Sequence, residues 1–165
     1  MQVEFINDDD FIKYKFKTKP FKHQYDVFLK SKDREAYALF MEQGTGKSKV
    51  IIDNIAYLYR KGKINCAIIS APKGVYRNWV ASEFKTHMPD DVKAFTDICI
   101  WNPAETKSNI EILTNFLNPS HRLKFFIVNI EALSTDKGKN YLTRLLNTSN
   151  CLWTIDESSN IKNRT

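Results

Sequence analysis

Several kinds of site are missing from this sequence. Its three cysteines, Cys66, Cys99 and Cys151, are isolated, odd in number and set inside apolar runs. They therefore suggest neither a disulfide framework nor a zinc site. The three histidines share no metal-ligand spacing, and none stands beside a candidate nucleophile. The cysteine usage instead predicts a reducing compartment.

Long apolar runs are also missing. No uninterrupted stretch approaches the roughly 20 apolar residues that a membrane span requires. The acidic start Asp8-Asp9-Asp10 is unlike the basic start of a secretory signal. We therefore expect no membrane partner and a cytoplasmic protein, located in the host cytoplasm if a phage encodes it.

Length and charge set broad limits. A chain of 165 residues has room for one domain with a real core, and we expect residues 1–165 to form a single domain. It carries 25 Lys and Arg against 19 Asp and Glu, a net charge of +6. This excess favours a polyanionic partner, but an ordinary solvated surface explains it equally well.

Apolar runs of strand length alternate with segments of helical period, which predicts an α/β fold with a mostly parallel central sheet. The expected strands are Ala36–Phe40, Asn65–Ser70, Asp97–Trp101, Lys124–Ile130 and Cys151–Ile155. The expected helices are Lys47–Arg60, Tyr76–His87, Ser108–Leu117 and Lys139–Leu146.

Two further elements are expected near the N-terminus. Between Phe11 and Lys17, apolar residues alternate with lysines, which predicts a short half-exposed edge strand. Pro20 then interrupts the chain. After it, apolar residues from Phe21 to Leu29 recur with the spacing of an amphipathic helix.

The most specific motif lies between the first expected strand and the first long helix. Its sequence is Phe40-Met41-Glu42-Gln43-Gly44-Thr45-Gly46-Lys47-Ser48. The two glycines allow backbone N–H groups to turn inward, and the following helix start adds a positive dipole end. In such a loop Lys47 reaches the β- and γ-phosphates and Ser48 binds Mg²⁺, while Gly44, Thr45 and Gly46 line the phosphates. The motif therefore predicts ATP and Mg²⁺ as ligands.

A second motif follows the last expected strand. Asp156 and Glu157 come directly after an apolar run. Asp156 is the candidate Mg²⁺ ligand, and Glu157 is the candidate base that activates the attacking water. Such a pair can also merely cap a helix. Because a phosphate loop stands upstream, we favour the catalytic interpretation, with Lys47, Asp156 and Glu157 as the catalytic set.

These motifs together resemble the first motor lobe of superfamily 2 helicases and translocases, especially the Swi/Snf-type branch found also in phages and bacteria. The segments that carry the resemblance are Lys19–Gln24, Met41–Ser48, Ala67–Pro72 with Asn78-Trp79 and Glu83-Phe84, Phe126–Ser134, and Asp156–Ser159 with Ile161–Asn163. The resemblance spans most of the chain. It implies a three-layer RecA-like P-loop NTPase domain of a DNA-dependent ATPase, with RNA a less favoured partner.

Within that resemblance, residues 1–35 look like an adenine-reading segment that ends ahead of the loop. The amide of Gln24 offers one donor and one acceptor, which match N6 and N7 of adenine. We therefore expect Gln24 to contact the base, although an ordinary polar position on a helix also explains it. A stacking aromatic from Tyr14, Phe16 or Phe21 stays unassigned.

Candidate nucleic-acid contacts follow two expected strands, where open α/β sheets place their ligands. They are Lys73, Gly74, Asn129, Ser134 and Thr135. Lys73 and backbone N–H groups would contact phosphates without reading sequence. Lys73 as a solvated lysine and Asn129 as a turn former remain equally plain explanations. Trp79 is expected to be a core or interface anchor.

In the motors that this chain resembles, ATP is enclosed between two lobes. The sequence ends at Thr165, before any second lobe. We therefore expect the chain alone to bind ATP weakly with little turnover. The alternative is a non-catalytic nucleic-acid-binding or partner-binding module that uses ATP only as a structural ligand. A P-loop kinase or GTPase is disfavoured, because the sequence has neither an Asn-Lys-x-Asp tetrad nor an arginine-rich lid.

Overall fold

The computed structural model describes residues 4–156. The chain divides into two compact units. One unit comprises Met1–Gly62 and Val80–Ala94, and the other comprises Lys63–Trp79 and Phe95–Thr165.

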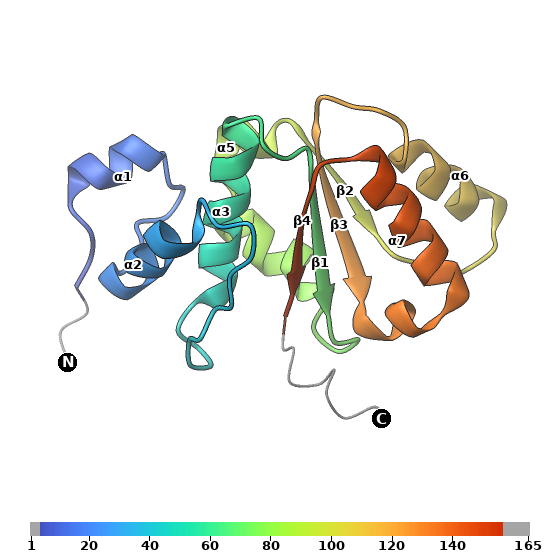
Figure 1. Ribbon diagram of the computed structural model, residues 1–165, viewed down its shortest axis with the longest axis horizontal. Coiled ribbons are helices and arrows are strands. Elements are labelled where there is room, and N and C mark those ends of the chain that lie inside the picture. The colour runs from blue at the N-terminus through green and yellow to red at the C-terminus, as the bar shows by residue number, and fades with distance from the viewer. Residues whose placement is uncertain (1–3, 157–165) are drawn as a thin grey trace. The chain divides into compact units, whose positions relative to one another are not determined.

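The second unit contains a parallel four-stranded sheet (Figure 1). Its strands are β1 (Cys66–Ala71), β2 (Thr96–Ile100), β3 (Leu123–Asn129) and β4 (Cys151–Ile155). They lie in the order β2-β3-β1-β4, and every neighbouring pair is parallel. The predicted α/β fold with a parallel sheet is therefore confirmed, and four of the five predicted strands form within one or two residues of their expected bounds.

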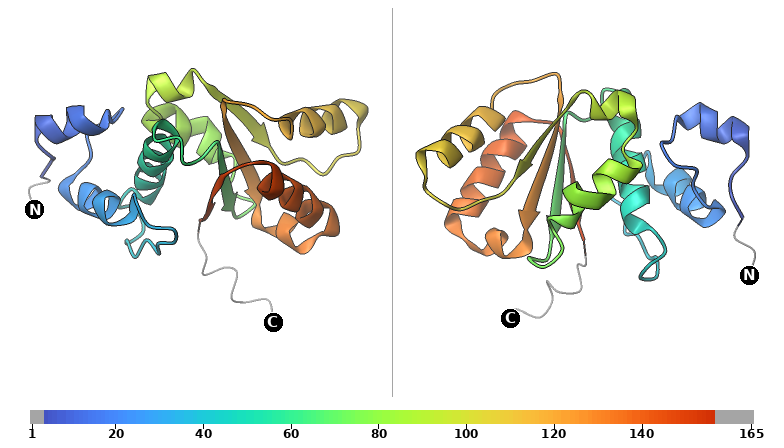
Figure 2. Two further views of the ribbon diagram at one scale, coloured as in Figure 1. Left: turned by 45° about the horizontal axis from the view of Figure 1, so that its top comes forward. Right: turned by 180° about the vertical axis from the view of Figure 1, so that it is seen from behind.

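Helices α6 (Lys107–Phe116) and α7 (Asp136–Thr148) lie against one face of this sheet (Figures 1 and 2). Leu113, Leu142 and Leu145 from these helices pack with alternate residues of the strands, among them Ile68 and Phe126. The central strands β1 and β3 are buried almost throughout, as the continuous apolar runs of parallel strands predict.

The connection between β3 and α7 is held by a helix cap. The chain passes through the 3₁₀-helix η2 (Ile130–Ser134), and Thr135 then accepts the N–H of Gly138 on its side chain. A Cβ at Gly138 would lie 2.2 Å from the carbonyl oxygen of Ala132, so only glycine fits at this close approach. This cap sets where α7 begins.

The first unit is helical. It contains α1 (Asp8–Tyr14), α2 (Lys22–Ser31), α3 (Lys47–Arg60), α4 (Lys85–His87) and α5 (Asp90–Lys93). Phe16, Phe28 and Val50 are at the centre of its core. The helix predicted over Lys47–Arg60 is confirmed at both ends, and α2 confirms the predicted amphipathic helix after Pro20. No helix among residues 4–156 is long and apolar enough to cross a membrane.

The edge strand predicted for Phe11–Lys17 is wrong, because its first four residues belong to α1 and Lys15 is the C-cap of that helix. The side chain of Asn7 accepts the N–H of Asp10 as an N-cap, and Asp8, Asp9 and Asp10 fill the first turn. Carboxylates are stabilised at that end of a helix. The cap and the acidic turn outweigh the period-two pattern of the lysines that follow.

The strand predicted for Ala36–Phe40 is also wrong. This segment has no regular structure, and Phe40 is 95% exposed. Its one backbone hydrogen bond among those described joins Phe40 N to the carbonyl of Ala38. A strand needs a neighbour for its N–H and C=O groups, and the described sheet provides none to this segment.

The helix predicted for Tyr76–His87 is confirmed in part. Turns occupy its first residues, and the π-helix η1 (Trp79–Phe84) and α4 follow. The helices predicted for Ser108–Leu117 and Lys139–Leu146 correspond to α6 and α7, of which α7 begins three residues earlier because of the Thr135 cap.

Candidate nucleotide-binding site

The predicted phosphate loop lies in the first unit and leads directly into α3. Gly44 and Gly46 both have left-handed backbones, with φ values of 80° and 84°. Gly46 is the N-cap of α3 and supplies no side-chain cap. The first N–H groups of a helix lack partners within the helix and attract anions. The loop therefore leads into a helix start that has no side-chain cap and that can attract an anion.

The ammonium of Lys47 is folded back onto this loop. Its Nζ donates to the carbonyl oxygens of Met41 at 3.0 Å and Glu42 at 3.2 Å. The hydroxyl of Thr45 donates to the same Glu42 carbonyl at 2.6 Å. An ammonium that donates only to neutral carbonyls forms stronger hydrogen bonds when a phosphate oxygen replaces them, because both partners are then charged. These residues fit a triphosphate.

Gln24 joins α2 to the phosphate loop. Its Nε2 donates to the carbonyl of Thr45 at 3.1 Å, and its Oε1 accepts the backbone N–H of Phe21 at 3.1 Å. The residue is only 5% exposed. A Cβ at Gly46 would lie 2.3 Å from this Nε2. Gln24 thus contacts the loop that follows it in sequence, and its contact with adenine stays a prediction.

Behind the loop, α3 carries a buried ion pair. Lys49 Nζ lies 2.7 Å from Asp53 Oδ2, and both side chains are at most 4% exposed. Burial raises the pKa of Asp53 to about 7, although Lys49 opposes that shift. Burial lowers the pKa of His87, and the charge of Lys49 adds to this effect. The charge of Asp53 is therefore sensitive to pH near neutrality, whereas His87 stays uncharged to a lower pH than an ordinary histidine does.

The second predicted motif lies in the other unit, directly after β4. The backbone N–H of Asp156 donates to the carbonyl of Ser70, and its Oδ2 accepts the indole N–H of Trp79 at 3.1 Å. Trp79 is 2% exposed. Glu157 lies outside the described residues, as do Ser158, Ser159 and Ile161–Asn163 of the same motif.

The role of Trp79 was missed in the sequence, where only its burial as an anchor was expected. A buried indole N–H requires a hydrogen-bond acceptor, and this requirement could have indicated a polar partner for Trp79. Trp153 makes a similar bond, because its Nε1 donates to Ser70 Oγ at 2.8 Å. Both indoles therefore support the end of β4.

Of the predicted nucleic-acid residues, Lys73 and Gly74 lie in an exposed turn after β1. Asn129 ends the neighbouring strand β3, and its Nδ2 donates to Glu131 at 3.1 Å. Because β1 and β3 are parallel neighbours, the register brings Ala71 beside Asn129. The sheet therefore brings the turn and Asn129 to the same edge.

Ser134 ends η2 and Thr135 follows it, and both residues are exposed. Thr135 already has a structural role, because its Oγ1 donates to the carbonyl of Ala132 at 2.8 Å and accepts from Gly138 N at 3.1 Å. A helix cap explains this threonine without a ligand.

The fold and the loop define a class. RecA-like P-loop domains typically combine three features: a parallel sheet in an α/β fold, a glycine-rich loop that leads into a helix, and an aspartate directly after a strand of the sheet. Residues 7–163 match the family described as Type III restriction enzyme, res subunit (ResIII), so the chain belongs to this family. Its domain is a RecA-like domain of the superfamily 2 helicases. No curated protein matches the chain. The family indicates an ATP-binding, helicase-like motor domain.

Proposed function

We propose that the chain is the ATP-binding lobe of a DNA-dependent ATPase, either a helicase or a duplex translocase, of the Swi/Snf-type branch. The observation that carries this proposal is the uncapped start of α3 at Gly46, with Lys47 held by loop carbonyls. The family match supports the same conclusion.

In this proposal Lys47 leaves the carbonyls of Met41 and Glu42 and binds the β- and γ-phosphates. The N–H groups from Gly44 to Ser48 surround the phosphates, and Gln24 contacts adenine. Ser48, and Asp156 through water, would hold Mg²⁺, which would neutralise charge on the phosphates. Glu157 orients the attacking water and accepts its proton.

The proposed DNA contacts are the residues that follow β1 and β3. Lys73 would contribute charge, whereas Gly74, Asn129, Ser134 and Thr135 would contribute short polar or backbone contacts to one strand. Such contacts bind phosphates and carry no sequence information. We propose duplex or single-stranded DNA as the track, with RNA less favoured.

We also propose that a second RecA-like lobe completes the motor. An arginine supplied from outside a phosphate site raises turnover by roughly 10³–10⁵ in GTPases. Residues 1–165 by themselves should therefore bind ATP weakly and hydrolyse it slowly, and they should not unwind DNA.

Titration calorimetry with a slowly hydrolysed ATP analogue and Mg²⁺ tests the proposal. Lys47→Ala should abolish measurable binding. Lys61→Ala is the matched control, because Lys61 is an exposed lysine at the other end of the same helix. Unchanged binding by the Lys47 variant would show that the loop does not hold the triphosphate.

A further inference from the structure

A row of polar side chains crosses the whole sheet at the amino ends of its strands. The backbone register pairs Asp97 of β2 with Lys124 of β3, Lys124 with Cys66 of β1, and Cys66 with Cys151 of β4. Residues paired in this way direct their side chains to the same face of a sheet. The two thiols therefore lie side by side on the face that α6 and α7 cover.

The two thiols interact directly. Cys66 is fully buried, and Cys151 is its direct partner on the neighbouring strand. Cys66 lowers the pKa of Cys151 against the opposing effect of burial, and the charge of Lys124 lowers it further. Cys151 and burial together raise the pKa of Cys66. Cys151 therefore ionises more readily than Cys66.

Lys124 is a buried base beside this pair. It is 2% exposed, and burial lowers its pKa, while Cys66, Cys151 and Asp97 act in the opposite direction. Its Nζ lies 3.5 Å from Ser149 Oγ. The Cys151 thiol donates to the carbonyls of Ser149 at 3.5 Å and Leu145 at 3.9 Å, and these contacts favour the protonated thiol.

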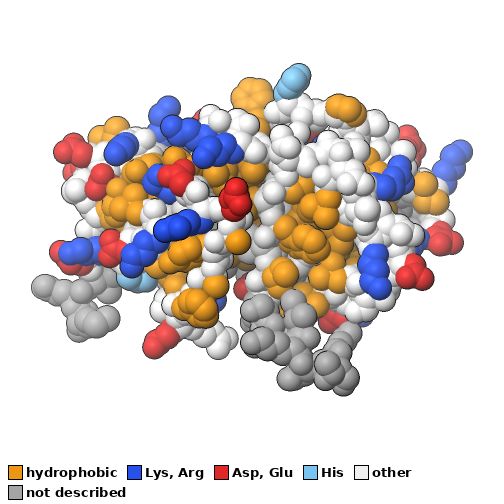
Figure 3. Space-filling view, viewed as in Figure 1, with side chains coloured by type: hydrophobic (Ala, Val, Ile, Leu, Met, Phe, Trp, Pro, Cys, Tyr) orange, Lys and Arg blue, Asp and Glu red, His pale blue; other side chains and the backbone are white. Residues whose placement is uncertain are grey.

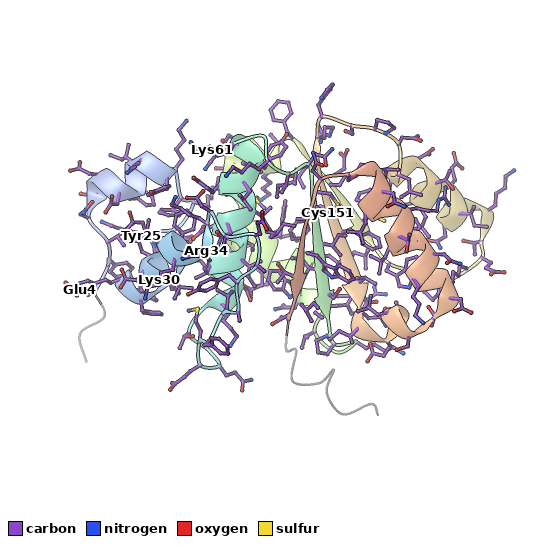
Figure 4. The ribbon with its side chains drawn as sticks, viewed as in Figure 1. Glu4, Tyr25, Lys30, Arg34, Lys61 and Cys151 are labelled. Carbon is purple, nitrogen blue, oxygen red and sulfur yellow. The ribbon has the colours of Figure 1, made fainter. Side chains whose placement is uncertain are left out.

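Access also distinguishes the cysteines. Cys151 starts β4 (Figure 4), which is an edge strand of the described sheet. Its side chain is only partly buried. Cys99, on β2, is 4% exposed, and burial raises its pKa to about 11. Thiolate reactivity requires both ionisation and access. Cys99 therefore serves as an internal reference of low reactivity.

We propose that Cys66 and Cys151 form a peroxide-sensitive dithiol, in which Cys151 reacts with a hydroperoxide and Cys66 resolves the product to a disulfide between β1 and β4. In the first step the Cys151 thiolate attacks one peroxide oxygen. An S–O bond forms and the O–O bond breaks. The peroxide is reduced to water or an alcohol, which takes up a proton, and Cys151 is oxidised to a sulfenic acid.

In the second step the Cys66 sulfur attacks the Cys151 sulfur. An S–S bond forms, the S–O bond breaks, and the departing hydroxide leaves as water with the proton of Cys66. Neighbouring strands lie about 4.8 Å apart, which is within the range of Cα separations of about 4.4–6.8 Å that disulfides span. The step therefore requires no separation of the strands.

The experiment exposes the 165-residue protein to hydrogen peroxide for a short time, blocks free thiols and maps peptides by mass spectrometry. We expect an intramolecular Cys66–Cys151 disulfide that dithiothreitol reverses, with Cys99 still reduced. Oxidation of Cys99 at the same rate, or a failure to find the Cys66–Cys151 peptide, would overturn the proposal.

Variants separate the two roles. Cys66→Ser should accumulate a dimedone adduct at Cys151, whereas Cys151→Ser should lose the rapid reaction and Cys99→Ser should keep it. Lys124→Met should slow the reaction at Cys151 by at least about threefold, because less thiolate is present. A dimedone adduct at Cys66 instead of Cys151 in the wild-type protein would contradict the assignment even if a variant fails to fold.

Discussion

The indole N–H of Trp79 donates to the carboxylate of Asp156 across 3.1 Å, although 77 positions separate them in the chain. A second bond, from the backbone of Asp156 to Ser70, fixes the same residue. Groups that orient a metal-binding carboxylate typically change metal affinity by about 10–100-fold when they are removed. Trp79 is therefore a positioning residue for the proposed Mg²⁺ ligand.

Trp79→Phe keeps most of the buried ring and removes its N–H donor. We expect it to raise the Mg²⁺ concentration needed for half-maximal binding of an ATP analogue by about tenfold. Trp153→Phe is the control, because it removes an indole bond to Ser70 instead. Equal effects of the two changes on Mg²⁺ dependence would remove Trp79 from this role.

Gly46→Ala tests the loop that opens α3. The alanine would need a left-handed backbone, and its Cβ would lie 2.3 Å from Gln24 Nε2, so the Gln24 side chain must move away from the loop. We expect loss of nucleotide binding and a loss of about 1–3 kcal/mol in the free energy of unfolding. Urea unfolding and calorimetry measure the two effects.

Gly62→Ala provides the control for that change. Gly62 also has a left-handed backbone, but a Cβ added there would meet no atom within 4 Å. It should lose about 1 kcal/mol in stability and keep nucleotide binding. If Gly46→Ala bound nucleotide as well as Gly62→Ala does, the loop would not contact the phosphates.

The buried Asp53 predicts a dependence of stability on pH. Its pKa is raised from an ordinary value near 3.8 to about 7 in the folded state. At pH values between 3.8 and about 7, the folded protein therefore binds more protons than the unfolded chain does. Asp53 thus favours the folded state at low pH. That contribution falls as pH rises through about 7.

Urea unfolding at several pH values between about 5 and 8 measures this slope. Asp53→Asn should flatten the slope, even though it leaves Lys49 unpaired and lowers the stability at every pH. His87 acts in the opposite direction, because its lowered pKa removes stability as pH falls. His87→Gln is thus the companion variant, and a slope unchanged by Asp53→Asn would contradict the assignment.

Lys73 tests the proposed DNA surface. Because each phosphate contact releases counterions, the logarithm of the binding constant falls linearly with the logarithm of salt concentration. Lys73→Ala should reduce that slope by about one and weaken binding to all DNA sequences alike. Lys139→Ala, an exposed lysine on α7, is the control. A motor lobe should also change its DNA affinity when nucleotide is added, whereas a simple binding module should not.

The sequence predicted those elements in which one strong pattern dominates. The helix Lys47–Arg60 has a glycine at each end and one apolar face, and its bounds were confirmed. Four strands were recognised from continuous apolar runs, although only β1 and β3 are buried almost throughout. The prediction for Ala36–Phe40 failed because a strand depends on partners that the local sequence does not specify.

The site was only partly accessible to sequence reasoning. The glycine loop and Lys47 follow from adjacent residues, whereas the bonds from Trp79 to Asp156 and from Gln24 to Thr45 join segments far apart in the chain. The Cys66–Cys151 pair was missed because isolated cysteines show no spacing signal. Only the strand order places the two thiols together.

The edge position of β4 has a consequence for handling the protein. Within the described residues β4 pairs only with β1, and Trp153 and Ile155 are 40% and 43% exposed. Apolar side chains gather over this part of the surface (Figure 3). An open strand with apolar neighbours is a template for pairing with another chain. We therefore expect concentrated solutions of the isolated protein to precipitate through intermolecular strand pairing that begins at β4.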